Sequence, residues 1–246
     1  MNEIQMKTSM SATGKSGFIK LEKRKKNLEN TTSNIRMKHM EKVYRNENPN
    51  MEIIKKSTEE EKGKEFSYFI GPEYLGYHAS LSAPFIHAFE LETLAPYIKE
   101  GSKILDIGSG SGYLEVAFSK LMNEKGLVVG VEHIYELYKL GRKNIAKKNK
   151  HLLESKKIIL ANQDGRKGFK DYAPYDVILV GGVAMYPPDE LLEQLANGGT
   201  LYIPIYSQTQ NITLFHKDEN GQITKEIVGH QIYPPLTSTK NQLAGL

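Results

Sequence analysis

A chain of 246 residues fits one domain with an extension. It contains no cysteine, which excludes disulfide bonds, thiolate metal sites and cysteine nucleophiles and fits a reducing, cytoplasmic location. The formal net charge of +4 is a mild excess of base that does not by itself indicate nucleic-acid binding. We expect no membrane span, because no apolar run approaches the roughly 18 residues that a spanning helix needs. No signal peptide is visible either.

Residues 1–64 read as a basic, polar N-terminal extension, and residues 65–246 as the folded domain. The extension has few large apolar groups and carries the basic run Lys23-Arg24-Lys25-Lys26. Its composition favours a solvated, partly disordered tail. A nuclear address, an RNA-binding arm or an arm that docks a protein partner stays open, whereas a mitochondrial presequence is poorly supported because lysine outnumbers arginine. Residues 35–45 could form one short helix.

The first helix of the domain is expected over residues 85–97. Pro84 suits a first helical turn, so Ser82 would lie near the helix N-terminus, where hydroxyls and anions are stabilised. The spacing predicts an inward-facing stripe made of Ile86, Phe89, Leu91, Leu94 and Tyr97.

A buried strand followed by a glycine turn organises the chain. Ile104, Leu105 and Ile107 are apolar on both faces, as in a parallel strand covered by helices. Glycines follow at 108, 110 and 112, and a helix is expected over residues 114–121. In the dinucleotide fingerprint the third glycine comes one residue later, where Tyr113 stands here. The pattern D-x-G-x-G-x-G, which begins at Asp106, resembles motif I of the class I S-adenosylmethionine (AdoMet) methyltransferases.

Two further acids stand at strand ends, as this resemblance requires. The strand over residues 128–132 ends in Glu132, whose carboxylate could accept hydrogen bonds from both ribose hydroxyls. The strand over residues 158–165 carries Asp164, suited to the adenine amino group. The competing interpretation is a generic α/β fold with acids that only cap turns.

The remaining elements complete an α/β pattern. An amphipathic helix is expected over residues 134–149, with its many lysines on the solvated face. A fourth strand (175–182), a helix (187–195), a turn at Asn197-Gly198-Gly199 and a fifth strand (200–205) follow. Residues 211–216 and 227–233 alternate like an antiparallel pair, joined by a turn at Glu219-Asn220-Gly221. We predict a Rossmann-like fold: a mostly parallel central sheet with helices on both faces and an antiparallel C-terminal strand pair.

From residue 76 to residue 242 the chain resembles the protein-L-isoaspartate (D-aspartate) O-methyltransferases. Residues 76–88 resemble the family's G-x-Q-A-T-I-S-A-P-x-x-H-A segment, and residues 105–112 its L-D-x-G-S-G-S-G. Residues 164–168 resemble D-G-R-x-G, residues 173–176 A-P-Y-D, and residues 233–237 Y-x-P-L-T. The first and last segments are specific to this family.

The resemblance implies an AdoMet-dependent carboxyl methyltransferase that acts on L-isoaspartyl and D-aspartyl residues of damaged peptides and proteins. By resemblance Ser82 is the active-site serine. The implied cofactor-binding residues are Ser80, Leu81, His87, Asp106, Gly108, Gly110, Ser111, Gly112, Glu132, His133, Asp164, Gly165, Thr237 and Gln242. No metal is expected, because the histidines lack metal-ligand spacing.

The chain departs from the family pattern in several places, including residues 180–185, which replace V-G-A-A-A-x, and the N-terminal region, which lacks a clear D-R-x-x-[FY] segment. His78 replaces a glutamine, Ser80 replaces a threonine, and the bulky Tyr206 replaces a glycine after the fifth strand. The changes at His78 and Tyr206 keep open a weak or inactive methyltransferase fold that serves as an adaptor in a complex. A class I methyltransferase with another acceptor such as RNA also stays open. The sequence shows neither the aromatic-rich nor the strongly basic surface that RNA work favours.

Overall fold

The computed structural model describes residues 71–245. The short helix expected at residues 35–45, the character of the extension over residues 1–64 and its role as a docking arm lie outside this range. Within it, no helix combines the length and the apolarity needed to cross a bilayer.

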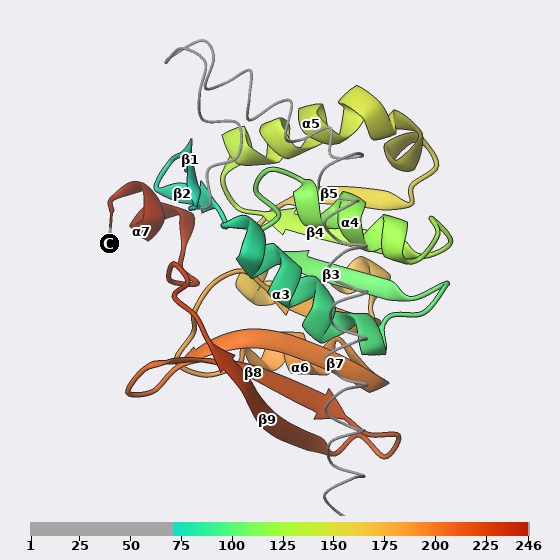
Figure 1. Ribbon diagram of the computed structural model, residues 1–246, viewed down its shortest axis with the longest axis vertical. Helices are drawn as coiled ribbons and strands as arrows, with labels where there is room; N and C mark the ends of the chain where they lie inside the picture. The colour runs from blue at the N-terminus through green and yellow to red at the C-terminus, as the bar shows by residue number, and fades with distance from the viewer. Residues whose placement is uncertain (1–70, 246) are drawn as a thin grey trace, which may run out of the picture. The chain divides into compact units, whose positions relative to one another are not determined.

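A seven-stranded sheet forms the centre of the described domain, in the order β5-β4-β3-β6-β7-β8-β9 (Figure 1). The first five strands of this order run parallel, whereas β8 is antiparallel to both of its neighbours. This arrangement confirms the predicted fold class. The strands are β3 (Lys103–Ile107), β4 (Leu127–Glu132), β5 (Ile158–Asn162), β6 (Tyr175–Val180), β7 (Leu195–Tyr206), β8 (Gln210–Lys217) and β9 (Ile223–His230).

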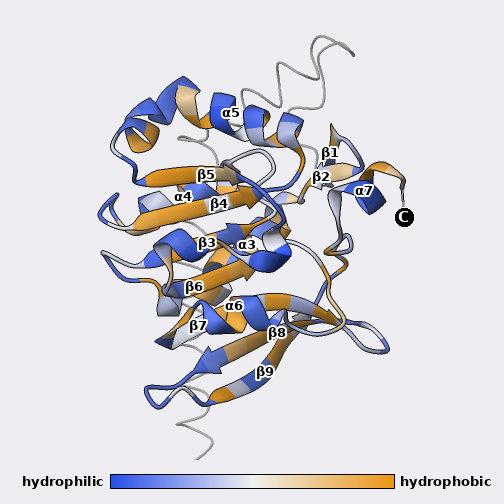
Figure 2. Ribbon diagram, turned by 180° about the vertical axis from the view of Figure 1, so that it is seen from behind, coloured by the Kyte–Doolittle hydropathy of each residue, from blue (hydrophilic) through white to orange (hydrophobic). Residues whose placement is uncertain are grey.

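Helices cover both faces of this sheet. In Figure 1, α3 (Pro84–Leu94) and α4 (Tyr113–Leu121) cross the face toward the viewer, and α6 (Asp189–Glu193) lies behind the sheet. The long α5 (Tyr135–Glu154) turns its lysines to solvent, as the blue face in Figure 2 shows. Short 3-10 turns are η1 (Ala95–Tyr97), η2 (Gly165–Lys167) and η3 (Lys170–Tyr172).

The core lies between the sheet and these helices. The strands β3, β4 and β6 are mostly apolar (Figure 2), and Leu105, Val129 and Ile178 are fully buried. Burial on both faces explains why these strands read as continuous apolar runs rather than alternating ones.

Two small elements lie at the carboxyl edge of the parallel strands, on the left of Figure 1. They are the hairpin of β1 (Glu73–Gly76) and β2 (Ala79–Leu81), and the helix α7 (Thr239–Leu243). The order of the sheet reverses beside β3, since β4 lies on one side of it and β6 on the other. Ligands of open α/β sheets bind at such a switch point, outside the carboxyl ends of the strands.

The inward stripe predicted for the first helix is partly wrong. Phe89 is 39% exposed and packs against Gly229 of β9, whereas His87 and Glu90 are buried. The buried positions Ile86, Glu90 and Leu94 follow the i, i+4 spacing of one helix face. The face that α3 turns to the core therefore differs from the one that its apolar residues alone predict.

Two boundaries differ near the C-terminus. The turn expected at Asn197-Gly198-Gly199 lies inside β7, which bulges there: Tyr175 pairs with Leu195, but Val177 pairs with Thr200. Gly198 has a φ of +78°, so a glycine accommodates the bulge without ending the strand. The strand expected at 227–233 runs instead from Ile223 to His230, because the turn over residues 218–222 pairs Lys217 directly with Ile223.

Candidate active site

The glycine turn holds bare main chain at the carboxyl end of β3. Gly108 donates its N–H to the carbonyl of Val131 at 2.8 Å, which fixes the turn to β4. A Cβ on Gly112 would lie 2.9 Å from the carbonyl oxygen of Gly141 in α5, so the turn packs directly on that helix. On the opposite side, a Cβ on Gly108 would meet only Gly181, at 4.0 Å. That side of the turn is open to a ligand.

Glu132 joins this turn to the end of β4. Its Oε2 accepts the N–H of Gly110 at 3.1 Å, and its Oε1 accepts the N–H of Ile134 at 2.9 Å. Each carboxylate oxygen keeps a second lone pair. The carboxylate is thus fixed in place and can still accept two hydrogen bonds from a ligand.

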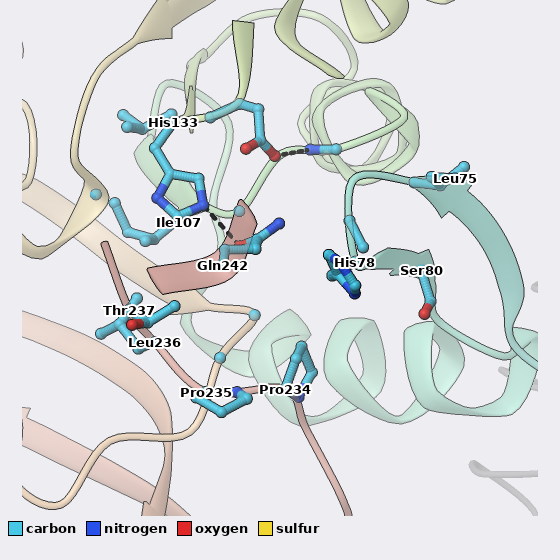
Figure 3. Close-up of a pocket in the computed structure, with 18 residues that line it drawn as sticks. Leu75, His78, Ser80, Ile107, His133, Pro234, Pro235, Leu236, Thr237 and Gln242 are labelled. Carbon is cyan, nitrogen blue, oxygen red and sulfur yellow. Dashed lines mark hydrogen bonds between the residues drawn. The ribbon is translucent and has the colours of Figure 1, made fainter. Parts of the chain in front are cut away.

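The helix α7 forms a roof over the ends of β4 and β2 (Figure 3). The ring Nε2 of His133 and the Oε1 of Gln242 are 2.7 Å apart, and the Gln242 amide donates to the carbonyl of Tyr77 at 3.0 Å. The hydroxyl of Thr239 adds a bond to the carbonyl of His133. One glutamine therefore connects three segments that are far apart in the sequence.

The segment over residues 233–237 forms the wall beside β6. Val183 donates its N–H to the carbonyl of Pro234, and Leu236 donates to the carbonyl of Val183, both at 2.8 Å. A Cβ on Gly182 would lie 3.2 Å from the Leu236 main chain. This close approach holds Pro234 and Pro235 against the mouth of the site.

Two adjoining cavities lie between these elements. We call the one beneath α7, of about 110 Å³, the roof cavity, and the one beside α3, of about 350 Å³, the serine cavity. Both are lined by Leu75, Ser80, Gly108, Gly110, Gly181 and Pro234. Of the predicted residues, the roof cavity adds Glu132, His133, Gly165, Thr237 and Gln242, and the serine cavity adds Leu81, Ser82, His87, Asp106 and Ser111.

Two predicted residues line neither cavity. Gly112 acts through the packing of the turn on α5. The carboxylate of Asp164 is turned to Arg166, whose guanidinium donates to it at 2.6 Å, and this partner lowers the pKa of Asp164. Two residues that depart from the family pattern differ in their place. His78 lines the roof cavity, whereas Tyr206 lines neither cavity.

Sequence reasoning missed several lining residues. Gly181 and Pro234 line both cavities, and Tyr113, Tyr233 and Glu90 line the serine cavity. Tyr113 stands directly after the glycine turn and Tyr233 opens the family's C-terminal segment, so the sequence could have indicated both as lining residues. No sequence motif indicated Glu90.

Buried acids surround the serine cavity. Burial raises the pKa of Asp106 to about 7 and that of Glu90 to about 8. Burial and the charge of Asp106 raise the pKa of Glu115 well above its usual value. Burial also lowers the pKa of His87 to about 4, so its ring, stacked on Tyr113 at 4.9 Å, is neutral. Among residues 71–245, no three acidic or histidine side chains converge as a metal site.

The family model for protein-L-isoaspartate (D-aspartate) O-methyltransferase matches residues 23–241. This chain belongs to that family. The match begins within residues 1–64, the predicted extension. An isoaspartate O-methyltransferase of Caenorhabditis elegans is 42% identical over 176 residues, which cover 71% of this chain and 78% of the relative. Protein-L-isoaspartate O-methyltransferase 1 of Arabidopsis thaliana is 37% identical over 180 residues, covering 73% and 78%.

A solved structure carries the same family name. The crystal structure of a putative protein-L-isoaspartate O-methyltransferase from Plasmodium falciparum, in complex with S-adenosyl-L-homocysteine, is 27% identical, with a TM-score of 0.66. The similarity covers 78% of this chain and 99% of the other. Family membership makes this chain an AdoMet-dependent carboxyl methyltransferase of isoaspartyl residues in damaged proteins.

Proposed function

We propose that this chain performs the family's repair reaction in the two cavities described above, with Ser82 positioning the acceptor carboxylate. The supporting observation is that thirteen of the fifteen residues implied by the resemblance line these cavities. They come from the β1–β2 hairpin, α3, the strand ends and the C-terminal segment.

The residues present fit AdoMet. The main chain at Gly108 and Gly110 is bare toward the cavities, and Glu132 keeps free lone pairs there for ribose hydroxyls. His133, Gly165, Thr237 and Gln242 would enclose the nucleoside end, and the cavity side of Asp106 and Ser111 the amino acid end. When bound, AdoMet supplies a methyl group on a sulfonium, a good leaving group.

This chemistry needs no general base. An isoaspartyl carboxylate has a pKa near that of an ordinary carboxyl, about 4, so the nucleophile is already ionised at pH 7. The protein therefore contributes alignment of the reacting atoms and exclusion of water. The roof made by α7 and the hairpin, and the wall at Pro234 and Pro235, perform the second task.

Ser82 lies just before the first turn of α3. Ala83 is the N-cap residue and Pro84 begins the helix, so the carbonyl of Ala83 accepts the N–H groups of Ile86 and His87. The positive end of the helix dipole favours an anion beside Ser82. A hydroxyl at this place could donate to the acceptor carboxylate and hold it in line with the methyl group.

The test is transfer of radiolabelled methyl from AdoMet to an isoaspartyl peptide, scored as a base-labile product. We expect Ser82→Ala to lower kcat/KM about ten- to a hundredfold, the effect of losing one hydrogen bond to a charged group. Ser155→Ala, at the exposed C-terminal end of α5, is the control and should keep full activity. Full activity of Ser82→Ala would contradict the role of the serine.

The two other hypotheses are not favoured. An adaptor would need neither the lined cavities nor the fixed carboxylate of Glu132. The named relatives are isoaspartate methyltransferases rather than RNA enzymes. Measurable binding of S-adenosyl-L-homocysteine without any labelling of an isoaspartyl peptide would restore the adaptor hypothesis.

We also propose a cytoplasmic location. The supporting observation is the absence of cysteine, which fits a reducing compartment. Cell fractionation with an antibody against this chain should recover it with cytoplasmic markers, and recovery in an organelle fraction would contradict the proposal.

A further inference from the structure

Glu90 is a buried acid that the repair reaction, as described above, does not use. It lies on α3, two turns after Ser82, and is 1% exposed. It lines the serine cavity together with Ser82, His87 and Asp106. An acid buried to this degree needs partners on both of its oxygens.

Among residues 71–245, only one of those oxygens has a hydrogen-bond partner. The hydroxyl of Tyr233 donates to Glu90 Oε1 at 2.8 Å, and the hydroxyl of Tyr202 lies 2.9 Å from that of Tyr233. Because Tyr233 uses its proton on Glu90, Tyr202 must donate to Tyr233. The other oxygen, Oε2, is buried and meets no hydrogen-bond partner among the described residues.

The surroundings keep Glu90 protonated at neutral pH. Burial and the nearby charge of Asp106 on β3 raise its pKa to about 8, although the bond from Tyr233 opposes the rise. The other titratable groups that face it are Tyr202 and Tyr233, whose own pKa values burial raises, and His87 on the same helix, which is neutral. With Oε1 accepting from Tyr233, the acidic proton is placed on Oε2. Glu90 is thus a hydrogen-bond donor without an acceptor.

We propose that Glu90 donates this proton in a hydrogen bond to a carboxylate bound in the serine cavity, and so acts as a binding residue for that ligand. An O–H to carboxylate bond is charge-assisted and stronger than a bond to a neutral acceptor. A neutral acid also attracts a carboxylate that an ionised acid would repel. The inference rests on the proposed function, because AdoMet and the isoaspartyl residue each bring one aliphatic carboxylate to this site.

Binding measurements test the proposal without turnover. The ligands are S-adenosyl-L-homocysteine, 5′-methylthioadenosine, which lacks the amino acid end and its carboxylate, and an isoaspartyl peptide added with S-adenosyl-L-homocysteine. Titration calorimetry from pH 6.5 to 9.5 gives the Kd for each. The variants are Glu90→Gln, which keeps a donor but cannot ionise, and Glu90→Leu, which has no donor. Glu92→Gln is the control, on the same helix but lining neither cavity.

We expect the wild-type affinity for one carboxylate ligand to fall about tenfold relative to Glu90→Gln between pH 7 and pH 9, as a donor with a pKa of about 8 ionises. Titration of the ligand's own ammonium is common to both proteins and cancels. Glu90→Leu should bind that ligand about ten- to a hundredfold more weakly at pH 7. Both Glu90 variants should bind 5′-methylthioadenosine with the wild-type Kd. Glu92→Gln should bind every ligand with the wild-type Kd at each pH.

The two carboxylates give different results. A pH effect on S-adenosyl-L-homocysteine assigns Glu90 to the cofactor, whereas an effect confined to the peptide assigns it to the acceptor. Parallel pH curves for wild type and Glu90→Gln with both ligands would overturn the proposal, and Glu90→Gln decides this even if Glu90→Leu does not fold. A fully active Ser82→Ala would overturn the role of the serine and leave these binding results unchanged.

Discussion

Replacing Glu132 by alanine is expected to weaken binding of S-adenosyl-L-homocysteine by at least about a hundredfold, since hydrogen bonds to a charged group contribute about 1.5–3 kcal/mol each. The substitution removes the acceptor proposed for the ribose hydroxyls. It also leaves the N–H of Gly110 without its bond to Oε2, so the turn keeps only its main-chain bonds to Val131 as ties to β4. Both effects act on the same ligand, which is why the expected loss exceeds that of a single contact.

Titration calorimetry with three variants separates these effects. Glu132→Gln keeps one oxygen acceptor but presents an amide donor to one of the two N–H groups, so an intermediate loss of about tenfold is expected. Glu136→Ala, an exposed acid in the first turn of α5, should bind like wild type. If Glu132→Ala bound the ligand normally, the ribose would have to be held by other groups.

The glycine turn could be predicted from sequence because its signal is local. Three glycines at alternate positions permit the positive φ angles observed at 108, 110 and 112, and the acid that follows the next strand must lie at the same edge of the sheet. The meeting of Gly110 and Glu132 follows from these two rules. The segment over residues 80–82 was placed by family resemblance, since its letters alone predict only a helix start.

Contacts between distant segments explain what sequence reasoning missed. An apolar helix pattern placed Phe89 inside, but Glu90 is inside because the hydroxyl of Tyr233, 143 residues later, provides its partner. No local window contains that pair. Asp164 shows the opposite case: a neighbour only two residues away, Arg166, takes the carboxylate that was expected to meet adenine.

An Asn-Gly-Gly sequence can form either a turn between two elements or a bulge within one strand. Asn197-Gly198-Gly199 is a strong turn signal, yet the chain bulges there and continues as β7. The pairing of Leu195 with Tyr175 before the bulge, and of Thr200 with Val177 after it, decides the outcome. Pairing partners across the sheet, rather than the glycines, therefore fix where this strand begins.

The second large effect concerns the stability of the protein and the buried acid Glu115, which lies in the first turn of α4. Glu115 is fully buried on α4, where its carboxyl interacts with its own main-chain N–H and with the carboxyl of Asp106 on β3. It lies over Gly130, where a Cβ would meet its Oε1 and leave it no room. Burial and the neighbouring Asp106 raise the pKa of Glu115 well above its usual value.

We expect Glu115→Gln to stabilise the ligand-free protein by about 1–3 kcal/mol at pH 8.5, because wild type must then either bury a charge or hold a proton that the unfolded chain releases. A raised folded-state pKa means that the folded protein holds a proton that the unfolded chain releases. The stability associated with that proton is therefore full below about pH 4.5, the ordinary value, and is lost as pH rises toward the folded pKa. Glutamine keeps the shape and removes the proton from this balance.

Urea denaturation at pH 5, 7 and 8.5 measures the difference directly. The gain of Glu115→Gln over wild type should be small at pH 5 and grow with pH, because only wild type must bury or protonate the acid as the solvent becomes more basic. Glu136→Gln is the matched control, since Glu136 also lies in the first turn of a helix but is exposed, and it should shift stability by less than about 0.5 kcal/mol at every pH. A gain that did not depend on pH would mean that Glu115 acts through its packing over Gly130 rather than through its proton.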